Sequence, residues 1–112
     1  MTEETNFYRQ DRDLHAIDNI DPTVHAPARL MILALLAVVD SADFNFLLNQ
    51  TGLTRGNLAS HLSRLEEAGY LNVEKTFLDR IPHTVYSLTD EGWLAIEKYR
   101  ENMQKVIDLL LK

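Results

Sequence analysis

The apolar positions in the first half of the chain predict two helices. Residues 26–39 are apolar nearly all round, which is typical of a helix buried on most of its sides. The polar run 40–43 follows, and its Asp and Ser side chains can cap the start of a helix. A short second helix then carries apolar residues at helical spacing, and Gly52 suits the left-handed position just past its end.

A third helix is predicted over residues 54–69, directly after the second. Leu58, Leu62 and Leu65 share one of its faces, as residues three or four positions apart do in a helix. Only residues 51–54 separate the two helices, and this stretch includes a glycine. Two helices joined by so short a turn form a helix-turn-helix.

The second half of the chain predicts a β-hairpin followed by one long helix. Apolar and polar residues alternate in 71–77, and residues 84–88 are a second run of β-branched and aromatic side chains. Residues 78–83 contain Asp, Arg and Pro, so we expect a hairpin loop longer than a tight turn. Thr89 can cap the final helix.

The outward face of the third helix is small and polar rather than rich in Glu and Lys. Asn57 can pair bidentately with adenine, and Arg64 can pair with guanine or a phosphate. Of the outward residues only Glu67 would repel phosphate. Ser and Asn are also common on helices that merely face water, so the helix alone leaves both interpretations open. The candidate DNA contacts on this helix are Arg55, Asn57, Ser60, His61, Ser63 and Arg64.

Arg80 stands at the tip of the predicted hairpin. A loop in this position can act as a wing that reaches the DNA backbone or the minor groove. Asp79 beside it weakens the positive field, and an exposed loop arginine without a partner is the alternative interpretation.

The last helix carries an apolar stripe that reaches far beyond a small core. Its members recur at alternating spacings of three and four residues, the pattern of a coiled-coil seam. We expect Trp93 and Leu94 to pack on the domain itself, and the stripe to bury against the same helix of a second copy. The alternative is that the stripe folds back over the chain's own first helix. The expected dimer residues are Ile96, Tyr99, Met103, Val106, Ile107 and Leu110.

Residues 1–22 are predicted to form an N-terminal arm or a short helix. They are polar except for a sparse stripe of Leu14, Ile17 and Ile20, which could join a dimer interface or remain loose. We expect one domain over residues 1–112, because this length is near the commonest domain size. Within it, 23–88 would be the helical and hairpin core, and 89–112 the last helix.

The net charge of the chain argues only weakly against DNA binding by the third helix. The formal net charge is −6, which does not favour a nucleic-acid partner. Residues 1–24, however, hold six acidic residues against two arginines, whereas residues 52–88 are balanced. The acidity therefore lies mainly away from the third helix.

Composition favours an ordinary globular chain, with 46% hydrophobic and 25% charged residues. The longest apolar run, residues 30–39, is about half the length of a membrane span. No secretory signal is visible in the sequence. We therefore expect a cytoplasmic protein that does not cross a membrane.

Metal and enzyme chemistry find little support in the sequence. The absence of cysteine excludes disulfides and thiolate metal sites. Asp21 and His25 are a carboxylate–histidine pair at helical spacing, but Pro22 and Pro27 disfavour a continuous helix there. No catalytic constellation or phosphate-binding glycine loop is present. We expect no metal, no cofactor and no enzymatic activity.

Three stretches resemble the winged helix-turn-helix regulators of the MarR/ArsR-like group, in its small stand-alone branch. The resemblance covers residues 20–99. The matching residues are Leu58, His61-Leu62, Leu65 and Glu66-x-Ala68-Gly69-Tyr70 in the third helix and its end, Tyr86-x-Leu88-Thr89-x-x-Gly92 at the last strand, and His25-Ala26-Pro27-x-Arg29-Leu30-x-Ile32-Leu33 in the first core helix. The fold implied is mainly α (α+β), a winged helix-turn-helix with three core helices, a two-stranded β-hairpin wing and a long C-terminal dimerisation helix.

Regulators of this group typically act as homodimers that place one helix per subunit in successive major grooves. The resemblance implies a sequence-specific DNA-binding transcriptional regulator, with helix 54–69 in the major groove and wing 78–83 on the backbone or minor groove. His83 joins Arg80 as an implied wing contact. The alternatives are a winged-helix protein–protein interaction module without DNA binding, and a ligand sensor with a pocket between the long helix and the core. The sequence identifies no particular small-molecule effector.

Overall fold

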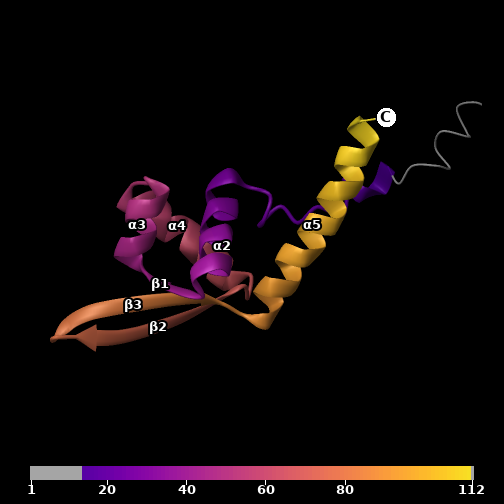
Figure 1. The fold of residues 1–112 in the computed structure, drawn as a ribbon. Coiled ribbons are helices and arrows are strands. Elements are labelled where there is room, and N and C mark those ends of the chain that lie inside the picture. The colour runs from indigo at the N-terminus through magenta and orange to yellow at the C-terminus, as the bar shows by residue number, and fades with distance from the viewer. Residues whose placement is uncertain (1–13, 112) are drawn as a thin grey trace, which may run out of the picture.

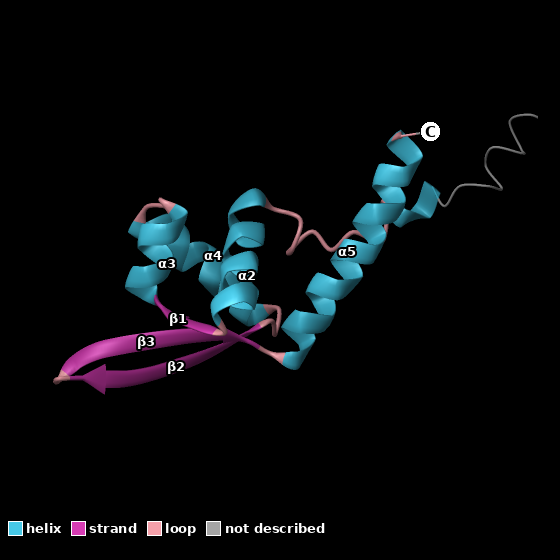
Figure 2. Ribbon diagram, in the orientation of Figure 1, coloured by secondary structure: helices cyan, strands magenta, loops and turns pink. Residues whose placement is uncertain are grey.

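The computed structural model describes residues 14–111 and shows helices packed over a small antiparallel sheet (Figure 1). Helices α2, α3 and α4 gather above the sheet in this view, the β2–β3 hairpin projects to one side, and α5 runs away to the other. Figure 2 marks the same elements by type. In chain order they are the 3-10 helix η1 (Leu14–Ala16), α2 (Pro27–Val39), β1 (Ser41–Asp43), α3 (Phe44–Thr51), α4 (Arg55–Glu67), β2 (Leu71–Leu78), β3 (Ile81–Leu88) and α5 (Asp90–Leu110).

The helix-turn-helix forms as predicted, between α3 and α4. Gly52 has a φ of 71°, and this left-handed conformation, which suits glycine, ends α3. The hydroxyl of Thr54 accepts a hydrogen bond from the Asn57 backbone N–H at 3.2 Å and caps α4. The inward leucines of α4 are completely or almost completely buried in a core shared with α2 and α3, at Leu58, Leu62 and Leu65. The third-helix prediction is confirmed.

The sheet has three strands, not only the predicted hairpin. Residues 41–43 were expected to supply caps, and Asp43 does accept a hydrogen bond from the Phe46 backbone N–H at 2.7 Å. The same residues also form β1, which pairs antiparallel with residues 85–87 of β3. The strand order is β1-β3-β2, so β3 is central. A three-residue strand was missed because its pairing partner lies more than forty residues away in the sequence.

The tip of the hairpin is a tight turn, and the expected long loop over 78–83 is wrong. Leu78 pairs with Ile81, which leaves only Asp79 and Arg80 between the strands. Both have positive φ, 50° and 68°, as the two central residues of a type I′ turn do. Pro82 fits within β3 because antiparallel pairs alternate, and its position opposite Phe77 does not need an N–H.

Helix α5 approaches the start of β2 at a glycine. A Cβ at Gly92 would lie 2.3 Å from the carbonyl oxygen of Tyr70, so only glycine fits without a backbone shift. That carbonyl accepts a hydrogen bond from the Thr89 backbone N–H at 3.1 Å. The Thr89 hydroxyl donates to the Gly69 carbonyl at 2.6 Å and accepts from the Gly92 N–H at 2.9 Å. These contacts fix the angle at which α5 leaves the sheet.

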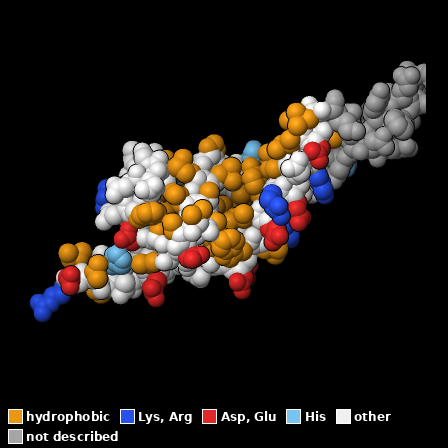
Figure 3. All heavy atoms as spheres, viewed as in Figure 1, with side chains coloured by type: hydrophobic (Ala, Val, Ile, Leu, Met, Phe, Trp, Pro, Cys, Tyr) orange, Lys and Arg blue, Asp and Glu red, His pale blue; other side chains and the backbone are white. Residues whose placement is uncertain are grey.

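Two apolar segments are less buried than their sequence predicts. Helix α2 packs on the core with most of its apolar residues, but Val38 on its outer side is 81% exposed. Trp93 and Leu94 were expected to pack on the domain, but they are 45% and 52% exposed. Figure 3 shows hydrophobic side chains over the face that includes α2 and α5.

Residues 15–26 lie against α5 and cover part of its apolar stripe. Ala16 is buried, and the Asn102 side chain donates a hydrogen bond to the Asn19 carbonyl at 3.2 Å. His25 and Tyr99 are joined at 2.9 Å between Nδ1 and the phenol oxygen. We call residues 15–26 the N-terminal strap. The rest of the predicted arm, residues 1–13, lies outside the described residues.

Candidate nucleic-acid interface

The outward side of α4 is an exposed, polar surface opposite its buried leucines. Thr54 fixes the first turn of the helix, and the leucine contacts fix its rotation about its axis. A recognition helix needs both constraints, because a small rotation would point different side chains at a groove. The candidate contacts that this surface exposes are Arg55, Asn57, Ser60, Ser63 and Arg64.

His61 is held by its own chain instead of being free on this surface. Arg29 of α2 donates a hydrogen bond from its guanidinium to Nδ1 of His61 at 3.1 Å, because an arginine can only donate. Loss of solvent contact and the positive charges of Arg29 and Arg64 lower the pKa of His61 below its usual value. The neutral imidazole therefore acts here as an acceptor within the protein.

Arg29 is the residue that the sequence interpretation missed. Its Nε donates to the Thr23 carbonyl at 2.6 Å, and a second guanidinium nitrogen lies 3.4 Å from the Pro22 carbonyl. One guanidinium thus joins the N-terminal strap to the middle of α4. The signal in the sequence was a single cation in the otherwise apolar run 26–39.

Arg55 and His83 line the same pocket, between the start of α4 and the outer half of the hairpin. The Arg55 guanidinium lies 5.4 Å from the centre of the Phe44 ring, within the range of a cation–π contact. His83 Nε2 lies 3.9 Å from a carboxylate oxygen of Asp43. Both line a polar pocket of about 220 Å³ together with residues 43–45 and 82–84. His83 is therefore close to the start of α4 and not in the wing turn.

Arg80 is the predicted contact farthest along the hairpin. It lies in the exposed turn between β2 and β3, at the tip that projects beyond the helices (Figure 1). Asp79 occupies the other turn position, as the sequence indicated. Arg55 and His83 thus line one pocket, whereas Arg80 lies at the tip of the hairpin, apart from them.

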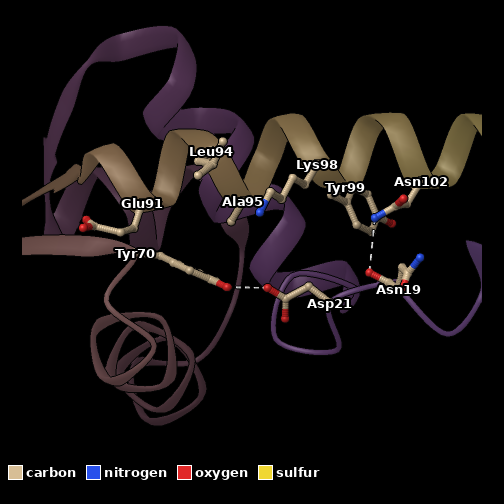
Figure 4. A pocket seen from close by; sticks show the side chains of 9 residues that line it. All are labelled: Asn19, Asp21, Tyr70, Glu91, Leu94, Ala95, Lys98, Tyr99 and Asn102. Carbon is tan, nitrogen blue, oxygen red and sulfur yellow. Dashed lines mark hydrogen bonds between the residues drawn. The ribbon is translucent and has the colours of Figure 1, made fainter.

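A pocket of about 360 Å³ lies between the strap and α5 (Figure 4). The Tyr70 hydroxyl donates a short hydrogen bond to the Asp21 carboxylate across it. This hydrogen bond, loss of solvent contact and the negative charge of Asp21 raise the pKa of Tyr70 to about 12. The labelled side chains of α5 in this view, including Lys98 and Asn102, line the opposite wall.

A second, more apolar pocket of about 390 Å³ lies farther along α5. Ile17 and Ile20 of the strap line it together with Met103 and Val106 of α5. Ile96 and Tyr99 pack against the main core. Four of the expected dimer residues therefore contact their own chain, whereas Ile107 and Leu110 are exposed.

Two further features of residues 14–111 bear on the kind of site present. None of the helices described is both long and apolar enough to cross a membrane. Within the same residues, no three or more His, Cys, Asp or Glu side chains gather into a group that could hold a metal ion.

Comparison with known proteins agrees with this fold. Residues 28–107 match the model of a family described as a winged helix DNA-binding domain. A transcriptional regulator homologue from Pyrococcus horikoshii has a TM-score of 0.79 and 31% identity, over 87% of this chain and 98% of that one. An uncharacterized protein of Methanocaldococcus jannaschii is 37% identical over 63% of this chain and 77% of its own length.

The solved structure of NadR, in complex with 4-hydroxyphenylacetate, is also similar. Its TM-score is 0.62 with 29% identity, and the match covers 80% of this chain and 65% of that one. The region that matches the family model, residues 28–107, includes almost all of α2, all elements from β1 to β3, and most of α5. The chain therefore belongs to the winged helix DNA-binding domain family, and its structural neighbours are transcriptional regulators of the MarR type.

Proposed function

We propose that the protein is a sequence-specific transcriptional regulator that reads the major groove with α4. The observation that carries this proposal is the exposed polar side of α4, which is rigidly backed by three buried leucines. Its small residues allow a close approach to the groove floor, and Asn57 and Arg64 supply pairing groups for bases. The cations Arg55 and Arg80 would contact phosphates or the minor groove and add affinity without sequence preference.

We propose that the regulator acts as a homodimer. The end of α5 supports this, because Leu110 is 78% exposed and Ile107 and Leu111 are exposed beside it. Apolar residues so far from the core need a partner to be buried. Two-fold symmetry would then place two α4 helices about one turn of DNA apart, roughly 34 Å.

Leu110→Glu tests the dimer. We expect sedimentation to shift toward the monomer, because the charge would have to be buried in the interface. An unchanged dimer would remove the end of α5 from the interface.

We further propose that the pockets along α5 hold a small-molecule effector. NadR was solved with a hydroxylated aromatic acid, and the pocket beside Tyr70 offers Lys98 to an acid group. With 4-hydroxyphenylacetate as the probe, the midpoint of thermal unfolding should rise. No shift at millimolar probe would exclude this class of ligand.

The DNA proposal is tested by selecting duplexes from random or genomic fragments and measuring affinity for the enriched sequence. Arg64→Ala should cost about 1–3 kcal/mol of binding free energy if the arginine reads a base. Arg100→Ala is the matched control, since it removes the same charge from an exposed position on α5. If wild-type protein enriches no fragment, the protein-interaction alternative replaces this proposal.

A further inference from the structure

The Arg29 guanidinium binds the N-terminal strap and α4 at the same time. Its Nε donates to the Thr23 carbonyl at 2.6 Å, and one terminal nitrogen donates to Nδ1 of His61 at 3.1 Å. The other terminal nitrogen lies 3.4 Å from the Pro22 carbonyl. The planar fork of N–H groups allows one arginine to reach several acceptors in this way. These three acceptors lie outside α2, so the side chain joins α2 to two other parts of the chain.

The same part of the strap is also linked to the end of α4. The Asp21 carboxylate accepts hydrogen bonds from the Thr23 backbone N–H at 2.9 Å and from the Tyr70 hydroxyl (Figure 4). The Tyr70 backbone N–H in turn donates to the Leu65 carbonyl of α4 at 3.0 Å. Val24, next to Thr23, is fully buried in the core that contains the α4 leucines. The strap therefore cannot move far without disturbing contacts that position α4.

On α4, His61 lies one helical turn from both side chains that we propose to pair with bases. Asn57 precedes it by four positions and Arg64 follows it by three, and residues at these spacings are neighbours on a helix surface. The buried leucines hold α4 from the core side, and Arg29 holds its flank between the two pairing residues. Both constraints matter, because a binding site works only when its groups are placed to within about 0.5 Å.

We propose that Arg29 is a positioning residue for DNA reading, which makes the orientation of α4 depend on whether the strap is docked against α5. The inference rests on the proposed DNA binding. With the strap docked, Arg29 holds His61, and Asn57 and Arg64 reach the base edges together. If the strap moves away, the guanidinium loses its carbonyl acceptors and no longer fixes the flank of α4. Phosphate contacts would then persist while discrimination between sequences falls, because only base contacts specify sequence.

Coupling between two sites is reciprocal, so DNA must also act on the strap. If the docked strap favours base reading, binding of the selected duplex favours the docked strap by the same free energy. Hydrogen exchange of the strap amides should therefore slow when this duplex is added. The Thr23 N–H is a suitable reporter, because its acceptor is the Asp21 carboxylate within the strap.

The first measurement is the ratio of affinities for the duplex that wild-type protein selects and for a scrambled duplex, with the full chain. Arg29→Met should lower this ratio about tenfold, within the usual range of coupling between sites. Arg29→Lys should lower it as well, because lysine keeps the charge but not the planar fork. Arg100→Met, at an exposed position on α5, is the matched control that should leave the ratio unchanged. An Arg29→Lys protein that discriminates like wild type would show that only the charge matters, and would overturn the proposal.

Two substitutions of His61 separate the hydrogen bond from a direct DNA contact. His61→Asn keeps an acceptor near the position of Nδ1 and should discriminate like wild type, whereas His61→Leu has no acceptor and should lower the ratio. The double variant Arg29→Met/His61→Leu should lose no more than Arg29→Met alone, because both changes remove the same interaction. Additive losses would mean that His61 contacts DNA itself, and would refute the link through Arg29.

Hydrogen exchange of the strap amides is the second measurement. In the free protein His61→Leu should speed this exchange, because the change on α4 reaches the strap through Arg29, and Ser60→Ala on the exposed side of α4 should not. The selected duplex should slow the exchange in wild type but not in Arg29→Met. Unchanged strap exchange in both comparisons would refute the coupling and leave DNA binding by α4 intact. If wild-type protein selects no duplex, the proposed function itself fails and this inference fails with it.

Discussion

At one end of the molecule α3, α4 and the start of the hairpin share a core of buried leucines, whereas at the other end α5 and the N-terminal strap lie around two pockets and are joined by a few hydrogen bonds. The leucine core holds α4 in place and leaves the polar side of that helix exposed to solvent. The second end encloses two pockets between surfaces joined at Tyr70–Asp21, His25–Tyr99 and Asn102–Asn19. A close-packed apolar core suits the α4 surface, which must keep its shape. A few hydrogen bonds suit the contact between the strap and α5, which can open.

The largest expected effect separates the two sides of α4. Leu58→Ala should lower the free energy of unfolding by about 2–5 kcal/mol, because a fully buried leucine leaves a cavity. Ser60→Ala, on the exposed side, should change it by less than about 0.5 kcal/mol. Urea unfolding measures both. Equal effects of the two substitutions would contradict the division of α4 into a core side and a free side.

The junction between the two ends gives the next prediction. Gly92→Ala should lower the free energy of unfolding by about 1–3 kcal/mol, since the new Cβ meets the Tyr70 carbonyl. Gly56→Ala is the matched control, because a Cβ there meets nothing within 4 Å and alanine favours a helix. A stable Gly92→Ala protein would mean that α5 can leave the sheet at another angle.

Tyr70→Phe tests the strap contact. It should cost about 1–3 kcal/mol of unfolding free energy at neutral pH, because the Asp21 carboxylate loses a donor. The fold raises the pKa of Tyr70 to about 12, above the value of about 10 in an unfolded chain. This contribution is therefore complete below about pH 10 and is lost as the pH rises through about 12. Wild type and variant should converge in stability over that range, and a constant difference would refute the contact.

The smallest expected effect concerns His61, which joins α4 to Arg29. Its pKa is lower in the fold than in the unfolded chain, so the unfolded state binds more protons in acid. Stability should be complete above about pH 6.5 and fall as the pH drops below it. His61→Asn keeps an acceptor for Arg29 but does not titrate, and it should reduce this loss. An identical pH profile for the variant would show that His61 does not titrate in folding.

The helix-turn-helix could be predicted because its signals are local. The leucine spacing, Gly52 and the Thr54 cap each depend on neighbours within one or two helical turns. The family resemblance rested on the residues of α4 together with two other sequence stretches, 25–33 and 86–92. The identities of the exposed α4 residues also followed from this periodicity.

The remaining features depend on contacts between distant parts of the chain. Strand β1 exists because β3 passes beside it, and the wing turn uses Asp79 and Arg80 without the glycine that usually marks such a turn. The apolar stripe of α5 predicted that another apolar surface covers it, but not that the strap covers part of it. Arg29 gave only a weak signal, because the sequence does not show which groups its guanidinium reaches.

The salt dependence of binding to the selected duplex tests the central claim most directly. If α4 and the hairpin bind DNA, the logarithm of the affinity should fall linearly with the logarithm of salt concentration, as phosphate-bound counterions are released. Arg64→Ala should shift this line downward, and Arg100→Ala should leave it in place. No measurable binding of any duplex at about 50 mM salt, where phosphate contacts are strongest, would contradict the account.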